Sequence, residues 1–338
     1  MLKHTSVTAI GNAIIDIIIK VDDSFLYDNF LDKGSMKLVD SATSQNIIKK
    51  IDLSNVLQIA GGSACNSMAI LSQLRVNSKF IGNVANDDFG LQFTNSIANL
   101  GCQFFNIQDN SQPTAHSIIL VSKEDGERTM LTYLGASSKI ANLKINDIFF
   151  QDSAYFYIEG YLWDTESSIN TIKSAIDKAK YFQNKIIFSL SDSFCVDRHR
   201  QDFLDLINLE IDILFANQFE INSLLQLEEF NPELIAKFCA KFFDKIFVIT
   251  LAGEGAMIFH KNEYFKISSQ KIINPVDCTG AGDSFCAGFI YGLIKGCNLQ
   301  DSARFGNFIA EKIINKIGAR FTNEEIEEVA LYLDYTKK

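Results

Sequence analysis

The sequence of 338 residues is short of proline, histidine and tryptophan, and its cysteines form no recognisable pairs. Its three prolines make no linker, so we expect one main domain rather than domains joined by a tether. The four histidines lack the spacing of metal ligands, which argues against a zinc centre. The seven cysteines include no CxxC motif, which predicts reduced thiols in a cytoplasmic protein and not a disulfide framework.

Basic residues and long apolar runs are also scarce. Lys and Arg number 31 against 41 Asp and Glu, and the net charge of −10 argues against nucleic acid as a partner. No apolar run approaches the roughly 20 residues that a membrane helix needs, and Met1–Ile10 shows no signal peptide. We therefore expect no membrane contact. The hydrophobic fraction of 47% nevertheless predicts a sizeable core.

Strand-like and helix-like runs alternate over most of the chain. This alternation predicts an α/β fold with a mostly parallel sheet covered by helices on both faces. Strands are expected at 7–10, 14–21, 80–84, 155–158, 186–190, 213–216, 246–250 and 256–260. Helices are expected at 41–51, 63–74, 88–100, 166–179, 203–209, 219–225, 232–242 and 284–295.

Two segments, about 14–39 and 115–134, are rich in strand signals and do not fit this alternation. The second contains Glu124-Asp125-Gly126 between two strand-like runs, which is typical of a hairpin turn. We expect the two segments to form a small second sheet that projects from one main domain spanning 1–338. Over the carboxyl ends of the main strands, such a sheet would be a lid that excludes water.

The most specific pattern is the segment 277–283, DCTGAGD, which directly precedes a helix-like run. Small residues let backbone N–H groups approach a ligand closely, and a helix N-terminus adds partial positive charge. The segment therefore predicts a cradle for phosphate that holds the carboxylate of Asp283 instead of a lysine. Such a site suits phosphoryl transfer in which the protein also accepts a proton. A plain helix start is the structural alternative; a P-loop is excluded because no Walker A motif is present.

Polar residues in the N-terminal part suggest a second ligand contact. Gly61 and Gly62 precede Ser63 and Asn66 at an expected helix start, which indicates either close approach of a ligand to the backbone or a tight turn. Asp16 interrupts an apolar strand, where an ionised carboxylate is costly unless a group such as a sugar hydroxyl donates to it. A salt-bridged strand end is the alternative for Asp16.

Asn217 and Glu220 follow a strand that ends at the carboxyl edge of the expected sheet, where open α/β sheets bind ligands. Their spacing of three places them on one helical face, which suits a hydrated Mg²⁺ near phosphates. An N-cap Asn with a capping-box Glu explains the same pattern.

These motifs resemble those of the phosphofructokinase B/ribokinase family of carbohydrate and nucleoside kinases, over nearly the full length. Gly61-Gly62 is similar to the family's glycine pair, 217–220 to its NxxE motif and 277–283 to its DTxGAGD signature, with Cys278 in place of a threonine. Segments 11–16 and 62–67 resemble the corresponding motifs of adenosine kinases, although Ala64 and Cys65 depart from them. The resemblance implies a ribokinase-like three-layer α/β/α domain, Rossmann-like, with a small β-sheet lid.

The resemblance also implies an ATP-dependent kinase for a primary hydroxyl, first of all the 5′-OH of adenosine. Asp283 would be the base, with the N–H groups of Gly280, Ala281 and Gly282 and the lid residue Arg128 facing the transferred phosphoryl group. The acceptor would contact Asn12, Asp16, Gly61, Gly62, Ser63 and Asn66, with Tyr161 either stacked on the base or in the core. ATP would contact Asn217, Thr250, Gly253, Gly255, Gly280, Gly282, Asn307 and Ala310. Glu220 and Asn217 would hold Mg²⁺ through water, and K⁺ near Asp277 is expected by analogy alone.

Two other functions stay open at this point. A sugar kinase of the same fold would bind its acceptor without a wall for a nucleobase. A sugar-phosphate acceptor would call for extra cations near the lid, where Lys20, Lys33 and Lys37 are present but fit solvated charges more simply. A non-catalytic nucleotide-binding member would have lost the base, whereas Asp283 is retained. A monomer and a homodimer are both compatible with the sequence.

Overall fold

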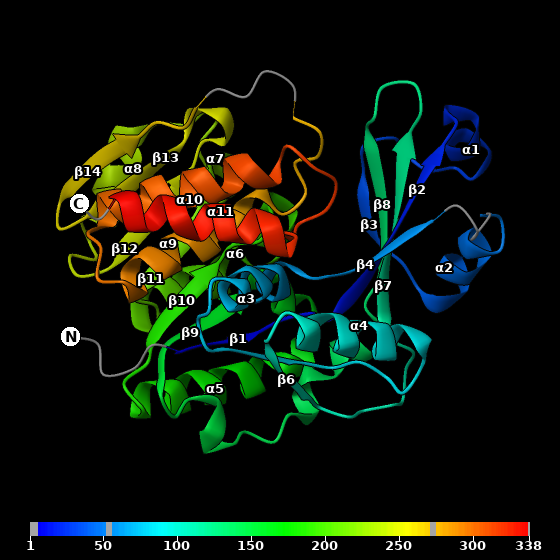
Figure 1. The fold of residues 1–338 in the computed structure, drawn as a ribbon, viewed down its shortest axis with the longest axis horizontal. Helices are drawn as coiled ribbons and strands as arrows, with labels where there is room; N and C mark the ends of the chain where they lie inside the picture. The colour runs from blue at the N-terminus through cyan, green and yellow to red at the C-terminus, as the bar shows by residue number, and fades with distance from the viewer. Residues whose placement is uncertain (1–5, 52–55, 271–274, 337–338) are drawn as a thin grey trace.

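The computed structural model describes residues 6–51, 56–270 and 275–336, and within them the main sheet has nine strands. They are β1 (Ser6–Ile10), β5 (Ser78–Gly82), β6 (Gln103–Asn106), β9 (Ser153–Glu159), β10 (Lys185–Ser189), β11 (Ile213–Asn217), β12 (Ile246–Thr250), β13 (Ala256–His260) and β14 (Glu263–Ile267). Their order is β14-β13-β12-β11-β10-β9-β1-β5-β6 (Figure 1). The ladders from β6 to β12 are parallel, and β13 pairs antiparallel with both of its neighbours.

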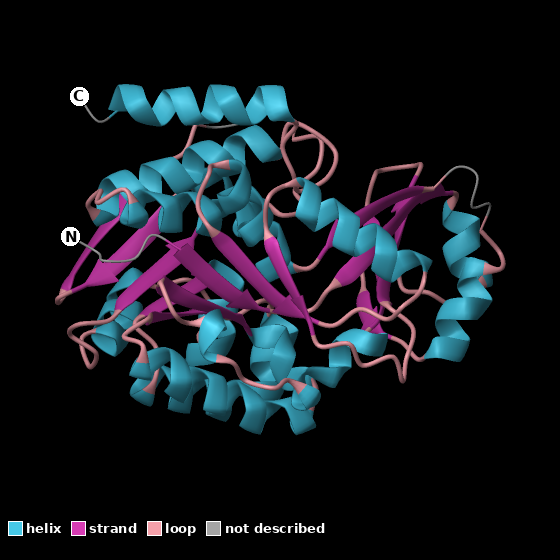
Figure 2. Cartoon of the chain, turned by 60° about the horizontal axis from the view of Figure 1, so that its bottom comes forward, coloured by secondary structure: helices cyan, strands magenta, loops and turns pink. Residues whose placement is uncertain are grey.

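Helices cover both faces of this sheet (Figure 2). One layer contains α3 (Ser63–Gln73), α4 (Asp88–Asn99), α9 (Ala281–Ile294), α10 (Leu299–Ile313) and α11 (Asn323–Thr336). The other contains α5 (Ile169–Tyr181), α6 (Ser193–Leu209), α7 (Gln218–Leu225) and α8 (Pro232–Cys239). The predicted three-layer α/β/α arrangement is therefore confirmed.

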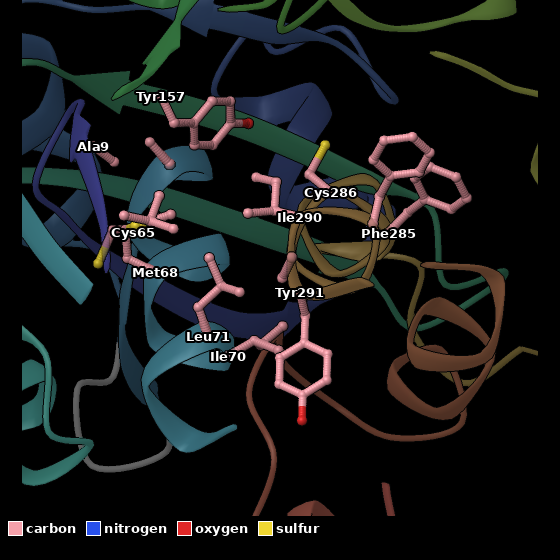
Figure 3. Close-up of a cluster of buried hydrophobic side chains, with 14 of the residues drawn as sticks. Ala9, Cys65, Met68, Ile70, Leu71, Tyr157, Phe285, Cys286, Ile290 and Tyr291 are labelled. Atoms are coloured by element: carbon pink, nitrogen blue, oxygen red, sulfur yellow. The ribbon is translucent and has the colours of Figure 1, made fainter. Parts of the chain in front are cut away.

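Alternation along the strands creates two cores, one for each helical layer. In β9, Tyr155 and Tyr157 pack toward α3 and α9, whereas Phe156 and Ile158 pack toward α5 and α6. Successive side chains of a strand point to opposite faces, so an uninterrupted apolar strand fills both cores. Figure 3 shows the first core, where Tyr157 lies near side chains of α3 and α9.

A second, five-stranded sheet projects from one end of the main domain (Figures 1 and 2). It contains β2 (Ile14–Val21), β3 (Met36–Leu38), β4 (Leu57–Gly61), β7 (Ala115–Ser122) and β8 (Arg128–Tyr133), in the order β3-β8-β7-β2-β4. One face packs on α1 (Asp23–Asp28) and α2 (Ser41–Ile48) through a small core that includes Leu26, Ile47 and Leu120. The face with Asp16 and Met130 lines a cavity described below.

The structure corrects several predicted boundaries. The segments 14–39 and 115–134 supply four strands of the small sheet, but β4 joins them from outside both, and 23–28 is a helix. β4 was missed because it runs directly into the glycine pair and because it pairs with β2, a segment distant in the sequence. α6 begins ten residues before the predicted 203, because the N-cap Asp192 accepts a hydrogen bond from the amide of Cys195 at 2.6 Å. The edge strands β6 and β14 and the helix α11 were not predicted.

Short 3-10 turns complete the chain at Gly135–Asn142, Asp147–Phe149, Gly160–Asp164, Glu166–Ser168 and Ala252–Glu254. Among the described residues, no helix is both long enough and apolar enough to cross a membrane. Residues 1–5 of the segment Met1–Ile10 lie outside the described residues, so the prediction made on this segment is not tested. All seven cysteines are free thiols, as the sequence predicted.

Candidate functional site

The site lies at the point in the main sheet where the strand order changes direction, so that the connections from neighbouring strands run to opposite sides. β1 and β9 are parallel neighbours, with β5 and β6 on one side of the pair and β10 to β12 on the other. Open α/β sheets bind ligands at the carboxyl ends of strands at such a switch point. Here Gly11 and Asn12 follow β1, and Glu159 ends β9.

Glu159 joins this loop to the start of α3. Its fully buried carboxylate accepts hydrogen bonds from the backbone amides of Asn12, at 2.7 Å, and of Ala64, at 2.8 Å. Burial raises the pKa of Glu159 to about 7, although both amides act to lower it. A Cβ at Gly11 would lie 2.7 Å from Glu159 Oε2, so a side chain there would displace the carboxylate. Glu159 was not among the predicted site residues; its signal, an acid in an apolar strand, is the one that singled out Asp16.

Asp283 lies in the first turn of α9 and is held by two side chains of α3. Ser63 Oγ donates to Asp283 Oδ1 at 2.7 Å, and Asn66 Nδ2 donates to Oδ2 at 2.9 Å. Burial raises the pKa of Asp283 to about 6, and the two donors oppose this rise. A carboxylate with this pKa is largely ionised at neutral pH and is well matched to accept a proton.

Two cavities meet at Asp283. The donor-side cavity is lined by residues that include Asn217, Glu220, Thr250 and Gly282, and the acceptor-side cavity by residues that include Asn12, Asp16, Gly62, Asn66 and Tyr161. Ser63, Ser191 and Asp283 line both. The structure therefore brings the predicted acceptor residues together and places the predicted base between them and part of the predicted ATP set.

The loop before α9 presents open backbone on the donor side. Gly280 is the N-cap with φ +73°, a left-handed conformation that favours glycine, and no side chain caps the helix. A Cβ at Gly282 would meet no atom within 4 Å. The amide of Ala281 donates to Cys278 O at 3.2 Å, so it is already engaged within the loop.

The glycine pair makes a tight turn and also lets neighbouring groups come close to its backbone. Gly62 has φ +99°, and a Cβ there would lie 2.1 Å from Asn12 O. A Cβ at Gly61 would lie 2.4 Å from Asp16 Oδ2, so the glycine leaves room for that carboxylate. The tight turn is therefore confirmed, whereas close approach of a ligand to this backbone stays a prediction.

Asp16 faces the acceptor-side cavity without a protein donor. No hydrogen bond or ion pair to its carboxylate is found among the described residues, so the alternative of a salt-bridged strand end is wrong. Burial raises the pKa of Asp16 to about 7, and the positive charge of Arg320 opposes this rise. A ligand hydroxyl would supply the missing donor.

Arg128 connects the small sheet to the loop before α9. Its guanidinium lies 2.6 Å from Asp277 Oδ1 and also donates to Thr279 Oγ1. Asp277 accepts further hydrogen bonds from the amides of Thr279, at 2.7 Å, and Gly318, at 3.0 Å. Burial alone would raise the pKa of Asp277, but these amides and Arg128 hold it below its usual value. Asp277 is thus a buried anion that fixes the loop and pairs with Arg128.

Asn217 and Glu220 form the capping box that was the structural alternative. Asn217 Oδ1 accepts from the amides of Phe219 and Glu220, and Glu220 Oε2 accepts from the amide of Asn217 at 2.9 Å. Both side chains also line the donor-side cavity, and burial raises the pKa of Glu220 to about 7. The capping box therefore orients two oxygen-bearing side chains at the edge of the cavity.

Four predicted ATP residues lie elsewhere, around the end of β14. Ser269 Oγ donates to Gly253 O at 2.8 Å, Asn307 Nδ2 donates to Ile267 O at 3.1 Å, and a Cβ at Gly255 would lie 2.0 Å from Ile267 O. Asn307 lines a separate cavity, and Ala310 packs against the core. These four residues lie outside the cavity with Asp283, and their contact with ATP stays a prediction.

Tyr161 belongs to the core, one of its two predicted roles, and also borders the acceptor-side cavity, while stacking on a nucleobase stays a prediction. It packs against the second core and lines the acceptor-side cavity, and its hydroxyl donates to Ser191 O at 3.3 Å. Asp164, from the same 3-10 turn, also lines this cavity and was not predicted, because nothing in the sequence of this turn marks it. The small sheet adds apolar side chains to this cavity, among them Ile14, Ile119 and Met130, and they were missed because pairing of distant strands brings them together.

A model of the pfkB family carbohydrate kinases matches residues 4–326. The chain belongs to this family. The adenosine kinase of Dictyostelium discoideum is 23% identical over 342 residues, which cover 94% of this chain and 97% of that protein. The ribokinase of Haemophilus influenzae is 23% identical and covers 82% of this chain and 89% of its own length.

Two solved structures are closer in sequence. The adenosine kinase from Sinorhizobium meliloti is 33% identical, with a TM-score of 0.87 and coverage of 98% of this chain and 99% of that one. A probable sugar kinase from Rhizobium etli CFN 42 is 35% identical, with a TM-score of 0.87 and coverage of 99% of each chain. The family makes this chain a kinase of nucleosides or sugars, which transfers a phosphoryl group from ATP to a hydroxyl.

Proposed function

We propose that this chain phosphorylates the 5′-OH of adenosine with ATP, giving AMP and ADP. The observation that carries the proposal is the position of Asp283, whose carboxylate lines both cavities. A base in this position can reach an acceptor hydroxyl in one cavity while a phosphoryl donor occupies the other.

The donor-side cavity fits the triphosphate of ATP. The N-terminus of α9 has no side-chain cap, and Gly282 leaves its backbone open, so the amide of Gly282 is free to meet phosphate oxygens, whereas that of Ala281 already donates to Cys278 O. Asn217 and Thr250 would contact the nucleotide from the strand ends. Glu220 and Asn217 carry the oxygen atoms that Mg²⁺ prefers and would hold the ion of Mg·ATP through water. The ion would supply positive charge on the phosphates.

The acceptor-side cavity fits a nucleoside because it combines a polar end with an apolar wall. Asn12, Asp16 and Asn66 offer groups for the ribose hydroxyls. The wall contains Ile14, Met36, Leu38, Ile119, Met130 and Leu134, mostly from the small sheet. An apolar wall favours a planar base over a bare sugar. The similarity to a solved adenosine kinase at 33% identity supports the same acceptor.

The chemistry assigned to the protein is one proton transfer and the positioning of two substrates. Ionised Asp283 accepts the proton of the acceptor hydroxyl as its oxygen bonds to the γ-phosphorus and the bond to ADP breaks. Ser63 and Asn66 hold the carboxylate in place. Arg128 brings positive charge from the small sheet to the loop, and the small sheet acts as a lid over the acceptor.

A sugar is the second candidate acceptor, favoured by the probable sugar kinase at 35% identity. One experiment separates the two: ADP formation is measured with ATP, Mg²⁺ and adenosine, guanosine, inosine, ribose or fructose at equal concentration. Adenosine should give the highest kcat/KM. A higher kcat/KM for ribose or fructose would show that the acceptor is a sugar, and the assignment as a kinase would stand.

A further inference from the structure

Asp164 is a buried acid of the acceptor-side cavity that the proposed reaction does not use. It ends the 3-10 turn Gly160–Asp164, and its side chain is only 6% exposed. Tyr161, from the same turn, lines the cavity beside it. Neither residue hydrogen-bonds to Asp283 or to the side chains that hold it, so the turn forms a part of the cavity wall distinct from the catalytic loop.

Two side chains of α6 fix the carboxylate of Asp164. Arg198 Nε donates to Oδ1 at 2.8 Å and Arg198 Nη2 donates to Oδ2 at 2.7 Å, while His199 Nε2 donates to Oδ1 at 2.9 Å. Each carboxylate oxygen accepts about two hydrogen bonds. Oδ1 is therefore saturated by these donors, and Oδ2 has one acceptor position left.

The same cluster does not suit a metal ion. Ligand atoms of Asp164, Cys195 and His199 lie within 4.8 Å of one another. Arg198, however, already occupies both oxygens of Asp164 with a positive charge, and burial raises the pKa of the Cys195 thiol, which disfavours the thiolate that a metal needs. The cluster is better explained as a clamp that orients one carboxylate.

We infer that Asp164 Oδ2 accepts a hydrogen bond from the exocyclic amine of a 6-aminopurine nucleoside and thereby selects adenosine among nucleosides. The inference rests on the proposed function. An amine supplies the N–H that Oδ2 lacks, whereas the 6-carbonyl of inosine would present lone pairs to a fixed carboxylate. Because Arg198 and His199 hold the carboxylate before the ligand arrives, binding costs little reorganisation.

The test removes the proposed hydrogen bond first by changing the ligand and then by changing the protein. Values of kcat/KM are measured for adenosine and for purine riboside, which lacks the 6-amino group, with wild type and Asp164→Ala. Wild type should prefer adenosine by about 10- to 100-fold, the range of a hydrogen bond to a charged group. Asp164→Ala should lose most of this preference. Arg198 is 41% exposed, so water can solvate its guanidinium in the variant.

Asp197→Ala is the matched control. Asp197 lies on α6 beside Arg198, accepts a hydrogen bond from Ser223 Oγ and lines neither cavity, so its loss should leave the preference for adenosine unchanged. Equal use of purine riboside and adenosine by wild type would overturn the inference without any variant. An unchanged preference in folded Asp164→Ala would overturn it as well. If no nucleoside is phosphorylated, the proposed function and the inference fail together.

Discussion

The two cavities that meet at Asp283 are built in different ways. The donor side consists of strand ends and helix starts of the main domain, with backbone from a single loop and the capping box of α7. The acceptor side is assembled from side chains of both sheets, and Arg128 links the small sheet to the loop before α9. Under the proposed function, phosphate recognition would depend on local backbone geometry, whereas acceptor recognition would depend on how the two sheets meet.

Asp283 belongs to both sides, so its substitution should have the largest effect. Asp283→Asn keeps the size of the side chain but removes the proton acceptor, and turnover should fall by about 10²- to 10⁴-fold. Binding of ATP, measured by calorimetry, should persist because the loop backbone is unchanged. Asp88→Asn, in the exposed first turn of α4, is the control and should leave turnover intact. Unchanged turnover in Asp283→Asn would show that Asp283 is not the base.

Asp16→Ala should affect the acceptor side alone. Its carboxylate has no donor among the described residues and lines only the acceptor-side cavity, so the loss should fall on a hydroxyl of the acceptor. We expect KM for adenosine to rise by about 10- to 100-fold with little change in KM for ATP. Steady-state kinetics with each substrate varied in turn measures both constants. Equal rises in the two would reject the contact to ribose.

Gly282→Ala should affect the donor side alone. The added Cβ meets no protein atom within 4 Å, so the fold is kept, and alanine within a helix adds up to about 1 kcal/mol of stability. The methyl group would instead enter the space of the phosphates, and KM for ATP should rise by about tenfold. Gly280→Ala is the contrasting variant: its Cβ would lie 2.3 Å from that of Ala319 at φ +73°, so Tm should fall. If Gly282→Ala left KM for ATP unchanged, the phosphates would not bind at this loop.

The donor side could be predicted from sequence because its parts are contiguous. The segment 277–283 places the glycines and the acid on one helix start, and the spacing of Asn217 and Glu220 predicts their shared position. The main sheet followed from the alternation of strands and helices for the same reason. Asn307 and Ala310 lie on α10, away from Asp283, and their contact with ATP stays a prediction carried over from the family.

The acceptor side could be predicted only in part. Asp16 stood out because a charge in an apolar strand requires a partner, and the glycine pair marked the entry to α3. Glu159 carried the same signal as Asp16 and was overlooked. Asp164 could not have been found, because its place depends on Arg198 and His199, which lie more than thirty residues away on α6. Pairing between distant segments also explains why β4 was missed.

The dependence of activity on pH gives the smallest effect and tests how both sides act on one carboxylate. Burial raises the pKa of Asp283 to about 6, and only the ionised form accepts a proton, so kcat/KM should fall about tenfold per pH unit below that value. Ser63 Oγ donates to the ionised carboxylate and thereby lowers its pKa. Ser63→Ala should therefore shift the midpoint of the profile upward, whereas Ser138→Ala, at a serine that donates to Gly135 O and lines neither cavity, should not. A midpoint that stays in place in Ser63→Ala would show that the profile reports another group, and Asp16, whose pKa burial raises to about 7, would then be the first to examine.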